Sequence, residues 1–148
     1  MKIIKFLIYL LPWFISSLFV DNNFYQNLIL PFFAPNKYIF IIMWTIIYFL
    51  LAISIYKIYD QYNFKKIKSY NYSLILNYIS NILFVISFFN FKNIFLGFIF
   101  TLIILITTLN LYNETRNLNK KYSKLLFIYI IWDLFAVILN LIIYLLNF

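Results

Sequence analysis

The chain has no cysteine and no histidine. The lack of cysteine excludes disulfides and thiolate chemistry, and the lack of both removes the commonest protein ligands of haem and transition metals. Charged residues are also scarce, at 11%, whereas hydrophobic residues occupy 66% of the 148 positions. Such a chain has too little polar surface to cover a soluble globule, so it is predicted to be an integral membrane protein.

Long apolar runs are the second feature of the sequence, and each of them, at about 17 to 23 residues, is long enough to span a bilayer as a helix. They lack the alternation of barrel strands, so helices are predicted. The expected fold is an all-α membrane protein, a bundle of five transmembrane helices forming one domain over residues 1–148. The predicted spans are Ile4–Val20, Tyr38–Tyr56, Tyr72–Phe89, Ile94–Tyr112 and Leu125–Leu146.

The net charge of +8 is distributed unevenly between the predicted loops. Two cations, Lys37 and Lys92, fall on one side of a five-span topology. The other side carries Lys2, Lys5, Lys57, Lys65, Lys66, Lys68, Arg116, Lys120, Lys121 and Lys124. This asymmetry predicts a cytoplasmic N-terminus and an outside C-terminus, in what we expect to be a bacterial cytoplasmic membrane. The basic loops are therefore expected to contact lipid headgroups, with no nucleic-acid partner. No small-residue cleavage site follows the first run, so we expect it to be a retained helix.

Two segments between or within the spans stand out. The connection from Asp21 to Lys37 is long and apolar for a loop, and we expect it to fold back as a lid over one end of the bundle. Asp133 lies well inside the last span, where an ionisable group is costly. It has two interpretations: a hydrogen bond between helices or protomers, which we favour, or an action on a ligand or on protons.

Residues four apart share a helix face, and three spans carry aromatic or amide side chains at that spacing. The stripes are Trp44, Tyr48 and Ala52 in the second span, Asn77, Asn81, Phe84 and Phe88 in the third, and Trp132, Ala136 and Asn140 in the fifth. Asn often joins membrane helices and aromatics often sit at the bilayer interface. The same residues could also line an apolar pocket with a few orienting polar groups.

Three segments carry a resemblance to a known family. FYQNLILPFFAPNKYIFIIMWTIIYFLLA, NYISNILFVISFF and IYIIWDLFAVILN resemble, in order and spacing, the conserved blocks of the translocator protein family (TspO/MBR, the tryptophan-rich sensory proteins). The resemblance implies a five-helix bundle, often a homodimer, whose first loop caps a cavity for porphyrins, related hydrophobic ligands and, in some members, sterols. No resident cofactor or metal is implied. The ligand-binding positions carried over are Tyr25, Pro31, Trp44, Tyr48, Asn81, Phe84, Trp132, Ala136 and Asn140.

The chain departs from the family pattern at several of these blocks. It has Phe24, Asn36 and Phe84 where the family has Trp, Pro and Trp, and it keeps three tryptophans in all. Light-driven porphyrin breakdown, proposed for some relatives, is tied to pocket tryptophans, whereas binding needs only shape, stacking and a few polar contacts.

We therefore expect a membrane ligand-binding or sensor protein. The alternatives are a porphyrin-modifying enzyme that uses Trp44 or Trp132, and a small transporter that uses Asp133. Enlarging Ala136 to Leu is expected to weaken ligand binding.

Overall fold

The structure is a computed structural model that describes residues 2–148, apart from the side chains of Lys2, Ser17 and Asn22. Lys2 is one of the cations in the predicted charge asymmetry, and its side chain lies outside the described part of the structure. Within residues 2–148 every regular element is helical. The α-helices are α1 (Lys2–Ile15), α2 (Asn22–Gln26), α3 (Lys37–Gln61), α4 (Lys68–Val85), α5 (Ile94–Leu118), α6 (Lys120–Ser123) and α7 (Phe127–Leu146). The 3-10 segments are η1 (Ser16–Phe19), η2 (Phe64–Lys66) and η4 (Lys124–Leu126), and η3 (Ile86–Asn90) is a π-helix.

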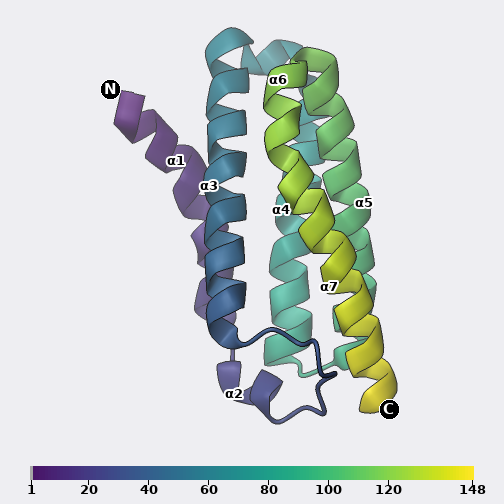
Figure 1. The fold of residues 1–148 in the computed structure, drawn as a ribbon. Helices are drawn as coiled ribbons and strands as arrows, with labels where there is room; N and C mark the ends of the chain where they lie inside the picture. The colour runs from purple at the N-terminus through teal and green to yellow at the C-terminus, as the bar shows by residue number, and fades with distance from the viewer. Residues whose placement is uncertain (1) are drawn as a thin grey trace.

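The predicted all-helical membrane fold is confirmed. Four helical segments, 37–61, 68–90, 94–118 and 120–146, are long and apolar enough to cross a membrane. The first predicted span, Ile4–Val20, falls on α1 and η1, but α1 is a shorter apolar helix, so the predicted count of five spans is not confirmed. Figure 1 shows α3, α4, α5 and α7 side by side, with α1 leaning away from α3 toward its N-terminal end.

Helix ends differ from the predicted spans because hydropathy marks the apolar run, not the end of hydrogen bonding. The fourth span was predicted to end at Tyr112, yet α5 continues to Leu118 through Glu114 and Arg116. It ends where Asn119 becomes extended and its side chain caps α6 by accepting from the backbone N–H of Lys121. The polar last turns of α5 are therefore helix, where a connector was predicted from residue 113.

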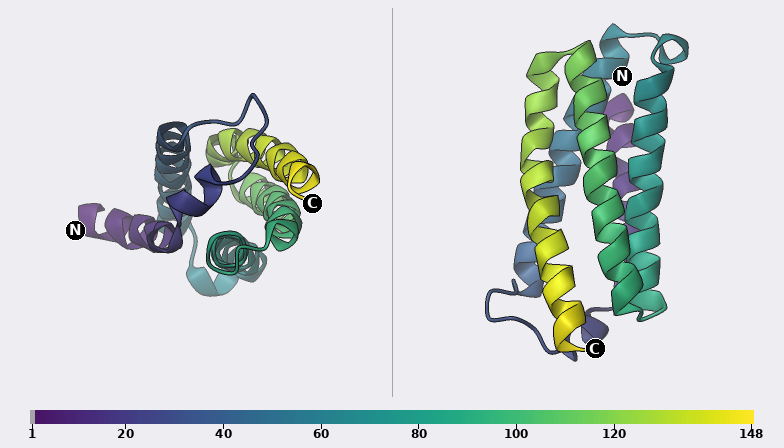
Figure 2. Two further views of the ribbon diagram at one scale, coloured as in Figure 1. Left: turned by 90° about the horizontal axis from the view of Figure 1, so that it is seen from below. Right: turned by 90° about the vertical axis from the view of Figure 1, so that its right-hand side faces the viewer.

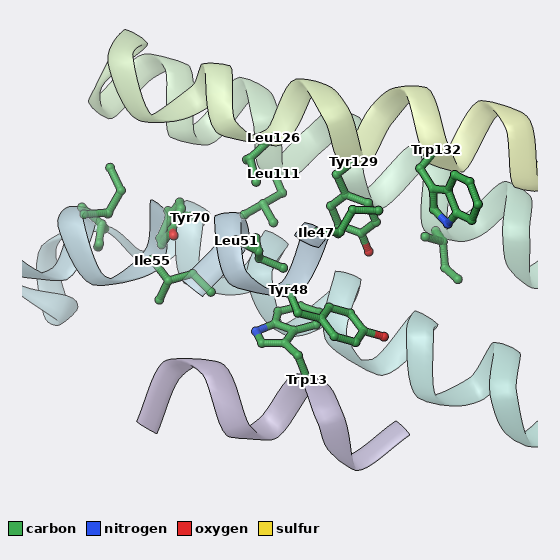
Figure 3. Close-up of a cluster of buried hydrophobic side chains, with 13 residues drawn as sticks. Trp13, Ile47, Tyr48, Leu51, Ile55, Tyr70, Leu111, Leu126, Tyr129 and Trp132 are labelled. Carbon is green, nitrogen blue, oxygen red and sulfur yellow. The ribbon is translucent and has the colours of Figure 1, made fainter. Parts of the chain in front are cut away.

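The core lies where α3, α4, α5 and α7 meet, with α1 packed against α3. Figure 3 shows its aliphatic part around Leu51, Leu111 and Leu126, and its aromatic part around Trp13 and Tyr48. Ala52, at 0% exposure, lets helices approach closely, as small residues do in membrane bundles. At the end of the bundle that carries the α2 loop, the packing opens into a cavity.

Candidate functional site

The cavity has a volume of about 400 Å³, within the range of small-molecule sites. Its walls come from α1, η1, α3, α4, η3 and α7, and α2 contributes Tyr25. Most of the lining is aromatic: Phe14, Tyr25, Phe40, Trp44, Tyr48, Phe84, Phe88 and Phe89. The aliphatic members are Val20, Ile41, Val85, Leu139 and Ile143, and the polar members are Ser16, Lys37, Thr45, Asn81 and Asn140. The site is thus an apolar, aromatic chamber with a few polar side chains.

Six of the nine sequence-predicted site residues line this cavity together: Tyr25, Trp44, Tyr48, Asn81, Phe84 and Asn140. Pro31, Trp132 and Ala136 are not in the lining. Pro31 lies in the loop between α2 and α3, where its carbonyl accepts from the N–H of Ala34 at 2.9 Å. The carbonyl of Ala136 accepts from Nδ2 of Asn140 at 2.9 Å, which holds the Asn140 amide against α7.

Trp132 stands behind the cavity wall. Its ring contacts Phe40 at 5.8 Å and Phe135 at 5.2 Å between centroids, so Phe40 separates it from the cavity. Helical spacing placed Trp132 and Asn140 on one stripe, but eight residues of an α-helix span more than two turns, and only the Asn140 end of the stripe reaches the cavity.

The long α3 helix is positioned by a cap that the family pattern lacks. The side chain of Asn36, at the place of a family proline, accepts from the N–H groups of Tyr38 and Ile39 at 3.0 and 3.1 Å. This is the usual N-cap arrangement. It fixes where α3 begins, so Lys37, Trp44 and Tyr48 face the cavity along one side of the helix.

Tyr48 joins the aromatic wall to η1. Its ring lies 5.4 Å from Trp44 and 5.9 Å from Trp13, and its hydroxyl is 3.3 Å from that of Ser16. Trp44 also contacts Tyr129 edge-on at 6.1 Å. These contacts hold the Trp44 and Tyr48 rings in place, so this wall is formed without a ligand.

The opposite wall depends on the close approach of α5 to the end of α4. A Cβ on Gly97 would collide with the Phe88 ring, so the Phe88 ring can lie here only because residue 97 is glycine. The π-helical turn η3 carries Phe88, which stacks on Phe84 at 5.7 Å with the ring planes 20° apart. Phe84 and Phe88 therefore present a continuous aromatic surface to the cavity.

The loop between η1 and α3 crosses the cavity end of the bundle, as Figures 1 and 2 show, and forms the lid expected from the sequence. Asn147, just after α7, fastens it with two hydrogen bonds to Ile29: the Ile29 N–H donates to Oδ1 and Nδ2 donates to the Ile29 carbonyl, both at 2.9 Å. Phe24 contacts Phe88 at 5.5 Å and Tyr25 contacts Phe40 at 5.5 Å. Partial burial raises the pKa of Tyr25 to about 12, so its hydroxyl stays a neutral hydrogen-bonding group under ordinary conditions.

Asn81 connects the cavity wall to a polar network inside the bundle. Its Nδ2 donates to the Tyr129 hydroxyl at 2.7 Å, and Tyr129 donates to Oδ1 of Asn77 at 3.1 Å. Asp133, at 2% exposure, lies in the same interior region and is not part of the cavity lining. The role of Asp133 stays a prediction: the Thr108 hydroxyl on α5 lies within reach of its carboxyl group, which fits the interpretation as a hydrogen bond between helices.

Several lining residues were missed by the sequence reasoning. Phe40 lies four residues before Trp44, so extending that stripe by one turn would have found it. Lys37 was treated only as a topology signal, although it lines the cavity at the start of α3. Phe14 and Ser16 gave no signal, because the leaning of α1 and the η1 turn decide where they point. Among the described residues, no group of three or more His, Cys, Asp or Glu side chains could hold a metal ion.

Taken together, the fold and the site define an integral, multi-pass helical membrane protein with an aromatic cavity beneath its first long loop. The model of the TspO/MBR family matches residues 5–145, and the chain belongs to this family.

Similar proteins agree with this assignment. The tryptophan-rich protein TspO of Bacillus cereus is 36% identical over 146 residues, which cover 98% of this chain and 95% of that protein. The tryptophan-rich protein TspO of Archaeoglobus fulgidus is 31% identical over 133 residues, covering 85% and 81% of the two chains. An uncharacterized membrane protein of Bacillus subtilis, YtaB, is 30% identical over 121 residues, covering 82% and 78%.

Proposed function

We propose that this protein is a membrane ligand-binding or sensor protein that takes a porphyrin or a similar planar hydrophobic molecule into the cavity under the lid. The observation that carries the proposal is the meeting of six sequence-predicted positions, from four separate helices, around one aromatic cavity. Stacked and edge-on aromatic side chains offer a flat apolar ligand a large contact area at low entropic cost.

The charge of the lining narrows the range of ligands that the cavity would accept. Lys37 is the charged member of the described lining, and Asp and Glu are absent from it. A planar apolar body that carries a carboxylate would place its rings between Trp44 and Phe84 and its anionic group near Lys37. Ligands with a cationic group would meet repulsion at the same place.

The membrane arrangement belongs to the same proposal. The 14 residues of α1 and the four of η1 together rise about 29 Å at 1.5 Å and 2.0 Å per residue, enough for a fifth crossing. The N-terminus and the basic connections at η2 and α6 would face the cytoplasm, and the lid would face outward. Association into a homodimer is part of this proposal on family grounds.

The test is a fluorescence-quenching titration of the purified full chain with protoporphyrin in the dark. Saturable quenching supports the proposal, and quenching that rises linearly without saturation contradicts it. A matched pair of variants locates the ligand: Phe84→Ala removes a cavity wall, whereas Phe95→Ala removes a ring that is 48% exposed elsewhere on the bundle.

A second candidate is catalytic modification of a bound porphyrin, which the position of Trp44 favours. Of the three tryptophans, Trp44 lines the cavity, while Trp13 and Trp132 are 4% and 8% exposed and outside its lining. This hypothesis predicts a light- or oxygen-dependent change in the porphyrin absorption spectrum that Trp44→Phe abolishes and Trp13→Phe does not. A spectrum unchanged under illumination would rule it out.

Proton-coupled transport is the remaining alternative, and it would use Asp133. Transport that is indifferent to Asp133→Asn would eliminate the coupling.

A further inference from the structure

A buried carboxyl group lies inside the bundle without a cation beside it. Asp133 is 2% exposed, and its Oδ2 is one of two buried polar atoms among the described side chains that lack a hydrogen-bond partner. The groups that act on it are the Thr108 hydroxyl on α5, the Tyr48 phenol on α3 and the Tyr129 phenol on α7. None of these is a cation, so nothing offsets the hydration that an ionised carboxylate would lose.

A chain of hydrogen bonds leads from the cavity toward this carboxyl, and its direction is fixed at the cavity end. Nδ2 of Asn81 donates to the backbone carbonyl of Asn77 at 2.9 Å, and a carbonyl can only accept. The Asn81 amide is thereby oriented, and its second N–H donates to the Tyr129 hydroxyl at 2.7 Å. Tyr129 in turn donates to Oδ1 of Asn77 at 3.1 Å.

The direction is fixed at the far end in the same way. Nδ2 of Asn77 donates to the hydroxyls of Thr107 and Thr108 at 3.1 and 2.9 Å. The Thr107 hydroxyl is itself a donor to the Ile104 carbonyl at 2.9 Å, so it must accept from Asn77. The Thr108 hydroxyl accepts from Asn77, and it lies within reach of both the Tyr129 hydroxyl and the Asp133 carboxyl group. The bonds donated by Asn81, Tyr129 and Asn77 therefore run in one direction, from the cavity to Thr108 beside the carboxyl group.

We propose that Asp133 is a proton-binding site, holding a proton on Oδ2 as a neutral carboxylic acid, and that this donor chain makes it respond to filling of the cavity. Oδ2 has no hydrogen-bond partner, so it is the oxygen free to carry the proton. The chain joins α4, α5 and α7, and two backbone carbonyls beside it hold the Asn81 amide and the Thr107 hydroxyl in their orientations.

The response of Asp133 to a ligand in the cavity depends on Oδ1 of Asn81, the side-chain atom of Asn81 that the chain does not use. Both of its amide hydrogens are used inside the bundle, so Oδ1 is the polar atom it can offer to water or ligand in the cavity. A ligand that displaces water from Oδ1, or donates to it, changes the polarisation of each following bond, because hydrogen bonds in series strengthen or weaken together. This coupling rests on the proposed function, whereas the proton site itself does not.

The first experiment is infrared spectroscopy of the ligand-free, detergent-solubilised full chain at neutral pH. A C=O stretching band of a protonated carboxylic acid is expected, and it is lost in Asp133→Asn, a substitution that keeps the shape of the side chain. Asp60→Asn, at an exposed position on the cytoplasmic-loop side of α3, is the matched control and keeps the band. Absence of the band in the unmodified protein would mean an ionised Asp133 and would overturn the proposal.

The second experiment tests the chain with a pair of tyrosine variants. Protoporphyrin is expected to shift the Asp133 band in the unmodified protein, and Tyr129→Phe abolishes the shift while keeping the band. Tyr78→Phe is the control, because its hydroxyl donates to the Pro12 carbonyl, outside the chain, and it keeps the shift. A shift that survives in Tyr129→Phe would overturn the role of the chain.

Failure of the proposed function is distinguishable from failure of this inference. If protoporphyrin binds no variant, the proposed ligand is wrong, and the ligand-free band still decides the proton site. The chain is then tested without ligand by Asn81→Ala, which is expected to shift the Asp133 band. An unshifted band in that variant would overturn the coupling.

Discussion

The two ends of the bundle are built from the same helices, but their centres pack differently. At the end that carries η2 and α6, the centre is filled by aliphatic side chains such as Leu51, Ile58 and Leu111, all at or below 1% exposure. A second pocket at this end is lined by residues of α1, α3 and its C-cap, η2 and α4, namely Tyr9, Tyr59, Tyr62, Phe64 and Leu74. Tyr62 also binds the end of α5 there, since its hydroxyl donates to the Leu118 carbonyl at 2.7 Å. At the lid end, rings and a few polar groups surround empty space.

The difference shows how a membrane protein makes a cavity without a hydrophobic driving force between its helices. Aliphatic and small side chains interdigitate, and dispersion contacts hold helices together. Large flat rings contact one another along the walls, Phe84 stacked on Phe88 and Trp44 tilted against Tyr48, and leave the centre unfilled. We expect stability to depend mainly on the closed end and ligand affinity on the open end.

The largest effect is expected at the closed end. Leu111→Ala should lower the free energy of unfolding by about 2 kcal/mol, the low end for a buried Leu, because the micelle keeps this side chain in apolar surroundings after unfolding and so reduces the transfer contribution. Denaturant titration in mixed micelles measures it. The control is Leu109→Ala, at 40% exposure on the same helix, and equal losses in the two variants would contradict the contrast between the ends.

At the open end, Phe84→Ala is expected to weaken protoporphyrin binding about tenfold, equivalent to about 1.4 kcal/mol, because it removes a stacking surface. Its effect on unfolding should be smaller than that of Leu111→Ala. Quenching titrations and denaturation of the same preparations check both statements. A Phe84 variant that lost stability but kept its affinity would reverse the assignment of the two ends.

The lid predicts a kinetic effect. Asn147→Ala removes both hydrogen bonds to Ile29, and losing a net stabilisation of about 1 kcal/mol should speed ligand release about fivefold. Stopped-flow dissociation is the measurement. The control is Asn63→Ala, which removes the hydrogen bond from the Lys65 N–H to Asn63 Oδ1 at η2, at the opposite end of the bundle, and is expected to leave the release rate unchanged. Equal release rates in the two variants would show that Asn147 does not hold the lid closed.

Lys37 predicts a smaller, salt-dependent effect. Lys37→Gln should weaken binding of protoporphyrin by about two- to fivefold at low salt, as expected for an exposed ion pair, and should not weaken binding of its dimethyl ester. Paired titrations at low and high salt measure this. Lys124→Gln, on the far side of the bundle, is the control, and an equal loss of affinity for the ester would show that Lys37 does not pair with a carboxylate.

Ala136→Leu is expected to have the smallest effect, and here two expectations diverge. The family resemblance predicts weaker binding, because it counts Ala136 among the ligand contacts. Its place outside the cavity lining predicts an affinity within about twofold of the unmodified protein, since a contact that is not made contributes nothing to the free energy of binding. The same quenching titration decides between them.

Much of the site could be predicted because helical spacing and family order both depend on local sequence. Trp44 and Tyr48 share a helix face by geometry alone, and both line the cavity. Trp132 shares a stripe with Asn140 for the same reason, yet the aromatic contact with Phe40 keeps it behind the wall. Local spacing therefore identified the right helix faces, and the tilt and packing of neighbouring helices decided how far along each face the cavity extends.

By itself the sequence determined that this protein lies in a membrane, that it is helical, and which helices carry the site. Hydropathy and the helical repeat are properties of single segments, so they can be found without the tertiary structure. The tertiary structure alone decided that Lys37 and Phe14 join the cavity, that Asn147 holds the lid, and that a chain of donors beginning at Asn81 leads to Thr108, close to the buried Asp133. These features join residues on different helices, and the direction of each hydrogen bond follows from partners that are distant in sequence and adjacent only in the folded bundle.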